Sequence, residues 1–179
     1  MNYFIQFLTI FRIVIAPIIF ILIAHFHFYG LALILFILAS ISDYWDGFLA
    51  RKYNLQSEMG AILDPVADKI LITFLIVALC IELSSIFIGM VGGIIIMREF
   101  WVSALREINA RRGDASITGV TFFAKIKTSV QLITFSCYLI GLFLNNSLLI
   151  FSSNFLLFLA LILTIQTGIQ YTTVTFKKF

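Results

Sequence analysis

The chain has 179 residues, of which 61% are hydrophobic and only 12% are charged. Its mean hydropathy of +1.09 excludes a water-soluble globular domain and favours a protein that lies in a lipid bilayer. The formal net charge of +3 is small. Anionic lipids and phosphate substrates account for it, so no nucleic-acid partner is expected.

The chain divides into apolar runs of about 20 residues, the length that a helix needs to cross the hydrocarbon core of a bilayer. In chain order, the runs cover residues 4–26, 30–52, 59–81, 85–110, 120–144 and 148–172. The sequence therefore predicts an all-α, polytopic membrane protein with six transmembrane helices. No long linker, low-complexity tract or internal repeat interrupts the runs, so residues 1–179 are expected to form a single transmembrane domain.

Basic residues are distributed on one side of the predicted membrane. The turns near residues 25–30, 84–85 and 145–147 contain no lysine or arginine, whereas the remaining connections, the helix ends beside them and the end of the chain contain Arg51, Lys52, Lys69, Arg98, Arg106, Arg111, Arg112, Lys125, Lys127, Lys177 and Lys178. Because lysine and arginine are retained on the cytoplasmic side, the three turns are expected to face outward and both termini to lie in the cytoplasm. Arg12, inside the first run, is left unexplained by this rule.

Four aspartates lie in the second and third runs. Asp43 and Asp46 are three residues apart, and Asp64 and Asp68 are four apart, so each pair lies on one face of its helix. The short connection near residues 53–58 predicts that these two helices are antiparallel neighbours. The four carboxylates are then expected to meet across the interface between the two helices.

Such a cluster is costly unless cations bind to it. An acidic side chain at mid-membrane costs roughly 2.5 to 3.5 kcal/mol on insertion scales. Asp64 and Asp68 stand in apolar helix sequence and not in a solvated loop. A site made only of oxygen ligands suits Mg²⁺, Mn²⁺ or Ca²⁺, and the absence of histidine and cysteine nearby argues against zinc.

Small and basic residues accompany the aspartates at fixed spacing. The sequence reads DxxDGxxAR, then eight residues, then GxxxDxxxD, with specified positions at Asp43, Asp46, Gly47, Ala50, Arg51, Gly60, Asp64 and Asp68. This pattern resembles the signature of the CDP-alcohol phosphotransferase family. The small residues leave room for a nucleotide diphosphate to approach the helix backbones.

The resemblance implies that the transmembrane domain is catalytic and that it binds two divalent ions, Mg²⁺ or Mn²⁺. It implies metal ligands at Asp43, Asp46, Asp64 and Asp68, of which Asp68 also acts as the catalytic base. It further implies that the CDP-linked donor is bound by Thr9, Asp43, Gly47, Ala50, Arg51 and Gly60. The hydroxyl of the acceptor would attack the β-phosphorus of the donor, and CMP would leave. A homodimer is implied in the same way.

Two further segments resemble the branch of this family that uses CDP-diacylglycerol and glycerol 3-phosphate to make phosphatidylglycerophosphate. They are residues 8–17 and residues 98–131. Two positions depart from the pattern of that branch, because Gln6 stands where asparagine is common and Ala124 where glycine is common. Ala124 leaves slightly less room beside the expected phosphate pocket. The implied location is a bacterial-type inner, cytoplasmic membrane, with the active site on the cytoplasmic side.

The basic residues of the fourth and fifth runs predict where the phosphate of the acceptor binds. Guanidinium groups bind phosphate oxygens bidentately and lysines add point charge, which suits a dianionic acceptor better than a neutral alcohol. Glu99 and Glu107 are expected to pair with nearby bases. The predicted acceptor-phosphate residues are Arg12, Arg98, Arg106, Lys125 and Lys127, with contact to the donor as the alternative for Arg12.

Alternative functions come from two classes. A cardiolipin synthase of the same family would use phosphatidylglycerol as its acceptor and would need the basic residues less, and other members use other acceptors. A non-enzymatic cation transporter would also bury carboxylates between helices. A transporter, however, has no need for the small residues at these spacings, and it would release no CMP.

Overall fold

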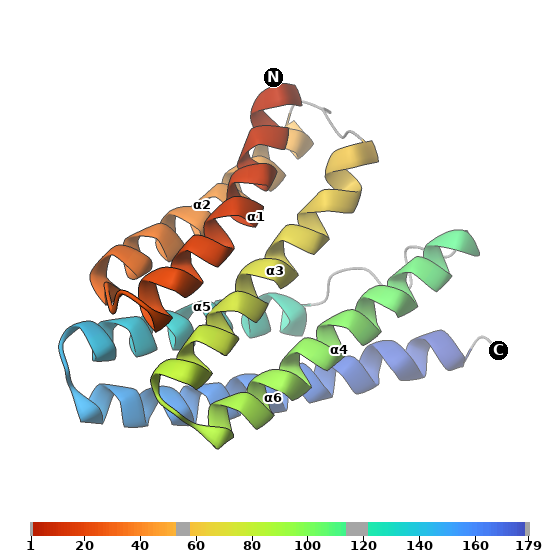
Figure 1. Ribbon diagram of the computed structural model, residues 1–179. Helices are drawn as coiled ribbons and strands as arrows, with labels where there is room; N and C mark the ends of the chain where they lie inside the picture. Colours follow the sequence, from red (N-terminus) through yellow and green to blue (C-terminus); the bar gives the residue numbers. More distant parts are fainter. Residues whose placement is uncertain (1, 53–57, 114–121, 178–179) are drawn as a thin grey trace.

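The structure is a computed structural model that describes residues 2–52, 58–113 and 122–177. These residues form the helices α1 (Asn2–Ala24), α2 (Tyr29–Lys52), α3 (Glu58–Glu82), α4 (Ile86–Arg111), α5 (Phe122–Phe143) and α6 (Ser147–Phe176) (Figure 1). The predicted all-α class with six helices is confirmed. The helix ends lie within two residues of the predicted ones, except that α6 continues to Phe176 instead of ending at residue 172.

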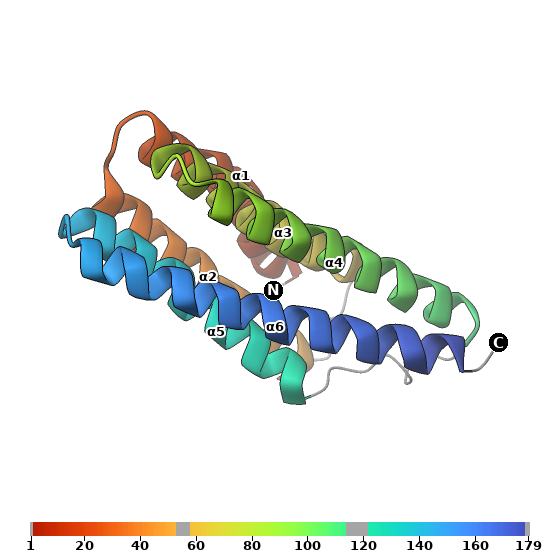
Figure 2. The same cartoon turned by 90° about the horizontal axis from the view of Figure 1, so that it is seen from below.

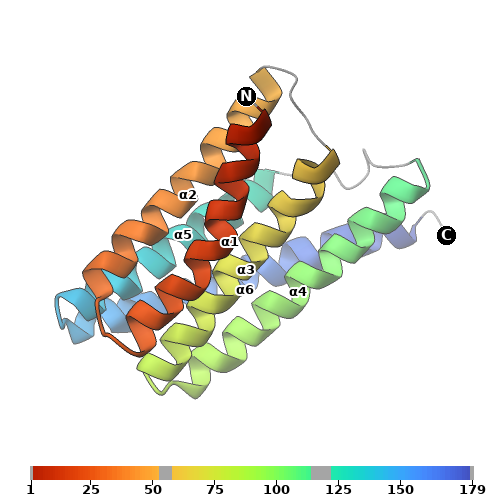
Figure 3. The same ribbon diagram turned by 45° about the horizontal axis from the view of Figure 1, so that its top comes forward.

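Three tight turns connect α1 to α2, α3 to α4 and α5 to α6. They gather at one end of the molecule, and both termini lie at the other end (Figures 1 and 3). Each turn contains a residue with positive φ, at His27 (56°), Ser84 (45°) and Asn145 (49°), a conformation that ends a helix. Ser85 and Asn146 then accept backbone N–H bonds from the first turns of α4 and α6. The three turns without basic residues thus share one end.

The helices form a closed ring in which each helix packs against two others. Around the ring the order is α1, α3, α4, α6, α5 and α2, and α2 packs against α1 again. Figure 2 shows the same arrangement as two layers, with α1, α3 and α4 in one and α2, α5 and α6 in the other. The prediction that α2 and α3 are direct neighbours is corrected, because in the described part of the chain α1 packs against both. The aspartates of both helices therefore meet at Arg12 on α1.

Apolar side chains fill the ring toward the end with the tight turns. All six helices contribute, and the fully buried side chains include Ile19, Ile23, Phe36, Leu75, Leu79, Ile88 and Leu139. Gly92 on α4 allows α3 to approach closely, because a Cβ atom there would collide with Ile76. The apolar core therefore holds one end of the ring together and leaves the other end to polar side chains.

The outer surface is apolar as well. Exposed large hydrophobic side chains include Ile86, Leu148 and Phe151, which are more than 70% exposed. Surfaces of this kind belong in lipid. Stretches long and apolar enough to cross a membrane lie at Phe7–Ala24, Ile86–Arg111, Ile126–Phe143 and Ser147–Phe176. The protein is therefore a polytopic membrane protein, and the membrane-spanning role of α2 and α3 stays a prediction.

Candidate active site

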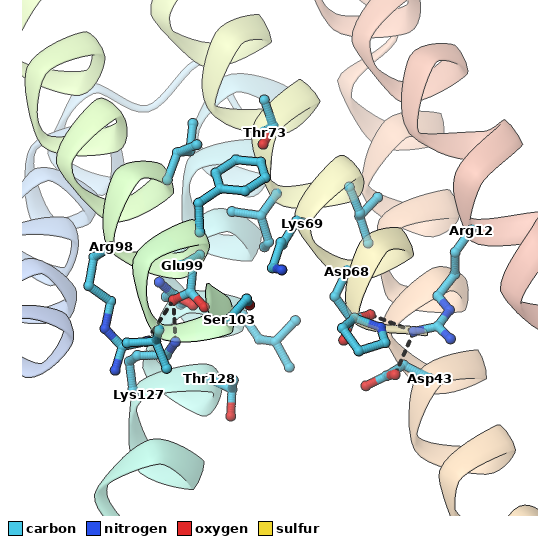
Figure 4. Close-up of a pocket in the computed structure, with 18 of the residues that line it drawn as sticks. Arg12, Asp43, Asp68, Lys69, Thr73, Arg98, Glu99, Ser103, Lys127 and Thr128 are labelled. Carbon is cyan, nitrogen blue, oxygen red and sulfur yellow. Dashed lines mark hydrogen bonds and ion pairs between the residues drawn. The ribbon is translucent and has the colours of Figure 1, made fainter. Parts of the chain in front are cut away.

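Three of the predicted aspartates meet around the guanidinium group of Arg12. Arg12 Nη1 donates to Oδ1 of Asp43 and to Oδ1 of Asp68, each at 2.5 Å (Figure 4). Arg12 Nη2 lies 3.4 Å from Oδ1 of Asp64. Thr9, one turn earlier on α1, donates its hydroxyl to the same Asp64 oxygen at 2.6 Å. One turn of α1 thus holds carboxylates from α2 and α3, and we call Thr9, Arg12, Asp43, Asp64 and Asp68 the acid cluster.

Burial within the acid cluster is uneven. The side chain of Arg12 is fully buried, whereas those of Asp43, Asp64 and Asp68 are 48%, 35% and 50% exposed. A buried guanidinium needs anionic partners because an unpaired charge in an apolar interior is costly. The aspartates supply these partners and still keep an accessible side. This pairing explains the arginine inside the first apolar run, and it places Arg12 with the aspartates instead of with the basic residues of α4 and α5.

The accessible carboxylates fit a divalent ion in donor type, because hard oxygen ligands are what Mg²⁺ and Mn²⁺ prefer. They also converge on a cationic group already, which shows that the site attracts positive charge. Within the described residues, no three His, Cys, Asp or Glu side chains form a closed coordination group. The carboxylates of the acid cluster are directed at Arg12, and Asp46, the second aspartate of the motif, is not among the described side chains.

Some predicted site residues lie in stretches of α2, α3 and α5 whose side chains the structure does not describe. They are one predicted metal ligand, four predicted donor-binding residues and one predicted acceptor-binding residue. The predictions for Asp46, Gly47, Ala50, Arg51, Gly60 and Lys125 therefore lie outside the described side chains.

A second set of charges comes from α4 and α5. Glu99 Oε1 lies 3.3 Å from Arg98 Nη1 and also forms an ion pair with Lys127 Nζ. Arg98 is 7% exposed and Lys127 is 5% exposed. Arg106 follows Arg98 two turns later on α4 and lines the same cavity. The structure brings these three predicted phosphate-binding residues together, and we call Arg98, Glu99, Arg106 and Lys127 the basic group.

Residues of α6 hold the two arginines of the basic group. Arg98 Nη2 donates to Thr167 Oγ1 at 2.6 Å, and Arg106 Nη2 donates to the Tyr171 hydroxyl at 3.3 Å. The guanidinium carbons of Arg98 and Arg106 lie 5.9 Å and 5.3 Å from the centroid of the Tyr171 ring, within the range of cation–π attraction. A Cβ atom at Gly168 would lie 3.1 Å from Arg98 Cγ, so glycine leaves room for this side chain.

Three members of the acid cluster, Arg12, Asp43 and Asp68, and the whole basic group line one cavity of about 320 Å³, to which all six helices contribute side chains. Figure 4 shows Arg12, Asp43 and Asp68 on one side of it and Arg98, Glu99 and Lys127 on the other. A cavity of this kind can hold a phosphate anion close to carboxylates that attract cations.

Sequence reasoning missed Thr167, Gly168, Tyr171 and the role of Lys69, which also lines the cavity. Thr167 and Tyr171 belong to no motif, and the only signal for them was polar side chains four residues apart within an apolar helix. Lys69 was counted only with the bases that indicate orientation. Its position directly after Asp68 in apolar sequence was the signal that could have drawn attention to it.

Comparison with known proteins agrees with the motif. The sequence model of the CDP-alcohol phosphatidyltransferase family, which is the family that the motif resembles, matches residues 5–166. This match covers most of the chain and includes every site residue that the sequence predicted. Members of this family are transferases that generally use divalent metal ions, so the cation-transporter alternative is excluded.

Similar proteins in bacteria cover nearly the same length. The chain is 40% identical over 129 residues to a protein of Wigglesworthia glossinidia brevipalpis, with 70% of each chain covered. It is 34% identical over 167 residues to a protein of Escherichia coli (strain K12) and 33% identical over 167 residues to one of Salmonella typhi, with 92% of this chain and 90% of the relative covered in both cases. All three are named CDP-diacylglycerol--glycerol-3-phosphate 3-phosphatidyltransferase. This chain belongs to the CDP-alcohol phosphatidyltransferase family.

Proposed function

We propose that this protein transfers the phosphatidyl group from CDP-diacylglycerol to glycerol 3-phosphate, giving phosphatidylglycerophosphate and CMP. The observation that carries the proposal is the placement of the acid cluster and the basic group on two sides of one cavity. The names of the bacterial relatives support the same donor and acceptor. The cavity needs no separate site for the acyl chains, because these can lie in the bilayer beside the helices.

The basic group binds the phosphate of the acceptor. Arg98 and Lys127 are almost fully buried and share the single carboxylate of Glu99, so positive charge is in excess on this side of the cavity. A phosphate dianion complements this charge and can accept paired hydrogen bonds from a guanidinium group. An uncharged alcohol would leave the excess positive charge of this group uncompensated, which disfavours it as the acceptor. Lys125 is assigned to the same phosphate by its place in residues 98–131, the segment that resembles the glycerol 3-phosphate branch of the family.

The acid cluster binds the pyrophosphate side of the donor. Asp43, Asp64 and Asp68, together with Asp46, are the residues that would hold two Mg²⁺ or Mn²⁺ ions. When bound, the ions neutralise the negative charge that develops on the leaving CMP. Thr9 and Arg12 keep the carboxylates in place through the bonds described above, so we assign Arg12 a positioning role in place of the acceptor-binding role that the sequence predicted.

In the transfer step, the hydroxyl oxygen of glycerol 3-phosphate forms a new bond to the β-phosphorus of the donor. The bond from that phosphorus to the bridging oxygen of the pyrophosphate breaks, and CMP leaves with the electron pair. Asp68 accepts the proton of the hydroxyl, a role supported by its half-exposed side chain on the wall of the cavity. The bond from Arg12 holds Oδ1 of this carboxylate in place.

The remaining assignments follow from the motif and the distribution of basic residues. Residues 1–179 form one catalytic domain in a bacterial cytoplasmic membrane, with the cavity and both termini on the cytoplasmic side. The protein forms a homodimer. Gly47, Ala50, Arg51 and Gly60 contact the CDP part of the donor.

The test is a reconstituted assay with defined acceptors. Purified protein receives CDP-diacylglycerol and Mg²⁺ with glycerol 3-phosphate, phosphatidylglycerol or an uncharged alcohol, and CMP release and the mass of the lipid product are measured. We expect CMP release with glycerol 3-phosphate only, together with phosphatidylglycerophosphate as the product. Cardiolipin formed from phosphatidylglycerol would establish the alternative acceptor. The absence of CMP with every acceptor would overturn the proposed function.

A further inference from the structure

One cation in the cavity has no part in the function proposed above. Lys69 follows Asp68 on α3, is half-buried and lines the cavity. Its ammonium nitrogen lies 5.4 Å from the centroid of the Phe100 ring on α4. Figure 4 shows Lys69 between the acid cluster on one side and the basic group on the other. Lys69 thus lies between the proposed phosphate-binding residues and Asp68.

The charges around Lys69 come from both sides of the cavity. Glu99 and Arg106 of the basic group line the cavity together with Lys69, and so does Asp68 of the acid cluster. Among the described side chains Lys69 forms no ion pair, and the carboxylate of Glu99 is already shared by Arg98 and Lys127. The positive charge of Lys69 adds to the excess positive charge of the basic group.

A half-buried ammonium group without a bound carboxylate is poorly compensated. The Phe100 ring offers cation–π attraction, but this replaces only part of the lost hydration. A phosphate oxygen would complete the compensation, since lysine binds phosphate as a point charge. The cavity wall that Lys69 occupies is on α3, whereas Arg98 and Arg106 approach the same space from α4.

We infer that Lys69 is a further acceptor-binding residue, which contacts the phosphate of the acceptor from α3 and selects acceptors that carry one. The inference rests on the proposed function and adds a specificity residue to it. Glycerol 3-phosphate carries its phosphate at one end and the attacking hydroxyl at the other. A cation next to Asp68 in the chain, on the same cavity as Arg98 and Arg106, holds the phosphate at one end of the acceptor while the hydroxyl at the other end reaches Asp68.

The experiment compares Lys69→Met with Lys69→Arg in the glycerol 3-phosphate assay. Methionine keeps an unbranched side chain and removes the charge, so we expect the KM for glycerol 3-phosphate to rise about tenfold or more, as for loss of a charged hydrogen bond. The KM for CDP-diacylglycerol is expected to stay unchanged, and Lys69→Arg is expected to recover part of the loss. Lys177→Met, which removes an exposed lysine at the end of α6, is the matched control and should behave like the unmodified protein.

A second measurement uses the unmodified protein and does not depend on how a variant folds. Lysines are labelled with an amine-reactive reagent with and without glycerol 3-phosphate, and labelling of each lysine is measured by peptide mass spectrometry. Glycerol 3-phosphate should protect Lys69 and leave Lys177 unprotected. Equal labelling of Lys69 in both samples, an unchanged KM for glycerol 3-phosphate in Lys69→Met, or a rise only in the KM for the donor would overturn the inference while the proposed function stands. An unmodified protein that makes no phosphatidylglycerophosphate would overturn both.

Discussion

In the acid cluster, a fully buried arginine lies beneath three aspartates that remain accessible, whereas in the basic group Arg98 and Lys127 are buried and share the carboxylate of Glu99. The accessible charge is negative on one side of the cavity, and the charge in excess is positive on the other. Each side is therefore prepared for a ligand of the opposite sign. One cavity can therefore bind cations and a phosphate anion because the two sets of charges are held apart.

The two sides are also held in place differently. Thr9 and Arg12 from α1 contact the carboxylates of the acid cluster directly. In the basic group, Tyr171 and Thr167 from α6 contact the arginines. In both cases a polar residue on an otherwise apolar helix fixes the orientation of a charge on its neighbour, which preorganises the site before substrate binds.

Removal of divalent metal is expected to have the largest effect and to act on the acid side alone. Carboxylates cannot neutralise a leaving CMP without cations, so a chelator should abolish CMP release, and added Mg²⁺ or Mn²⁺ should restore it. The measurement is CMP release from CDP-diacylglycerol and glycerol 3-phosphate before and after chelation. Undiminished turnover in chelator would contradict the cation-binding role of the acid cluster.

Asp68→Asn tests the acid cluster by substitution, in the presence of excess Mg²⁺. Asparagine has nearly the same shape but cannot accept the proton of the hydroxyl, so kcat should fall by about 100- to 10,000-fold while the KM for glycerol 3-phosphate changes little. Steady-state CMP release at varied acceptor concentration separates the two constants. Glu107→Gln, on the exposed pair with Arg111, is the control. Full activity in Asp68→Asn would contradict the role of Asp68 as the catalytic base.

Arg98→Gln tests the basic group and should change the KM for glycerol 3-phosphate more than kcat. Loss of a charged hydrogen bond to the acceptor phosphate is expected to raise the KM for glycerol 3-phosphate about 10- to 100-fold, with a smaller change in kcat. Arg111→Gln removes an exposed arginine from the same helix and should leave the KM unchanged. A fall in kcat at constant KM would show that Arg98 acts in some way other than binding the acceptor.

Tyr171→Phe is expected to have the smallest effect, because it removes only a hydroxyl that accepts a hydrogen bond from Arg106. Phenylalanine keeps the ring beside Arg98 and Arg106 but loses the hydroxyl that accepts from Arg106, so the KM for glycerol 3-phosphate should rise about two- to tenfold. Tyr171→Leu also removes the ring and should raise it further. Tyr171 lies outside residues 5–166, which the family model matches. Equal KM values for the two variants would show that the ring itself contributes nothing.

The all-α membrane class, the six helices and the acidic motif could be predicted from the sequence alone. Apolar runs and residue spacing are local properties, so they can be recognised without knowing which helices pack together. The partners of Asp43 could not be found in this way. Two carboxylate pairs in successive helices suggested that the helices were direct neighbours, but a charge on α1 brings the carboxylates together.

Other contacts could be found only in the folded structure. Arg12 lies among the aspartates, Tyr171 lies against Arg98 and Arg106, and Lys69 lines the cavity between the acid cluster and the basic group. The Arg12–Asp43 contact joins residues 31 positions apart in the chain, and the Arg106–Tyr171 contact joins residues 65 positions apart. Such contacts depend on which face each helix presents to its neighbours in the ring. That choice follows from the packing of apolar side chains and the pairing of buried charges over the whole bundle, and no short stretch of sequence contains it.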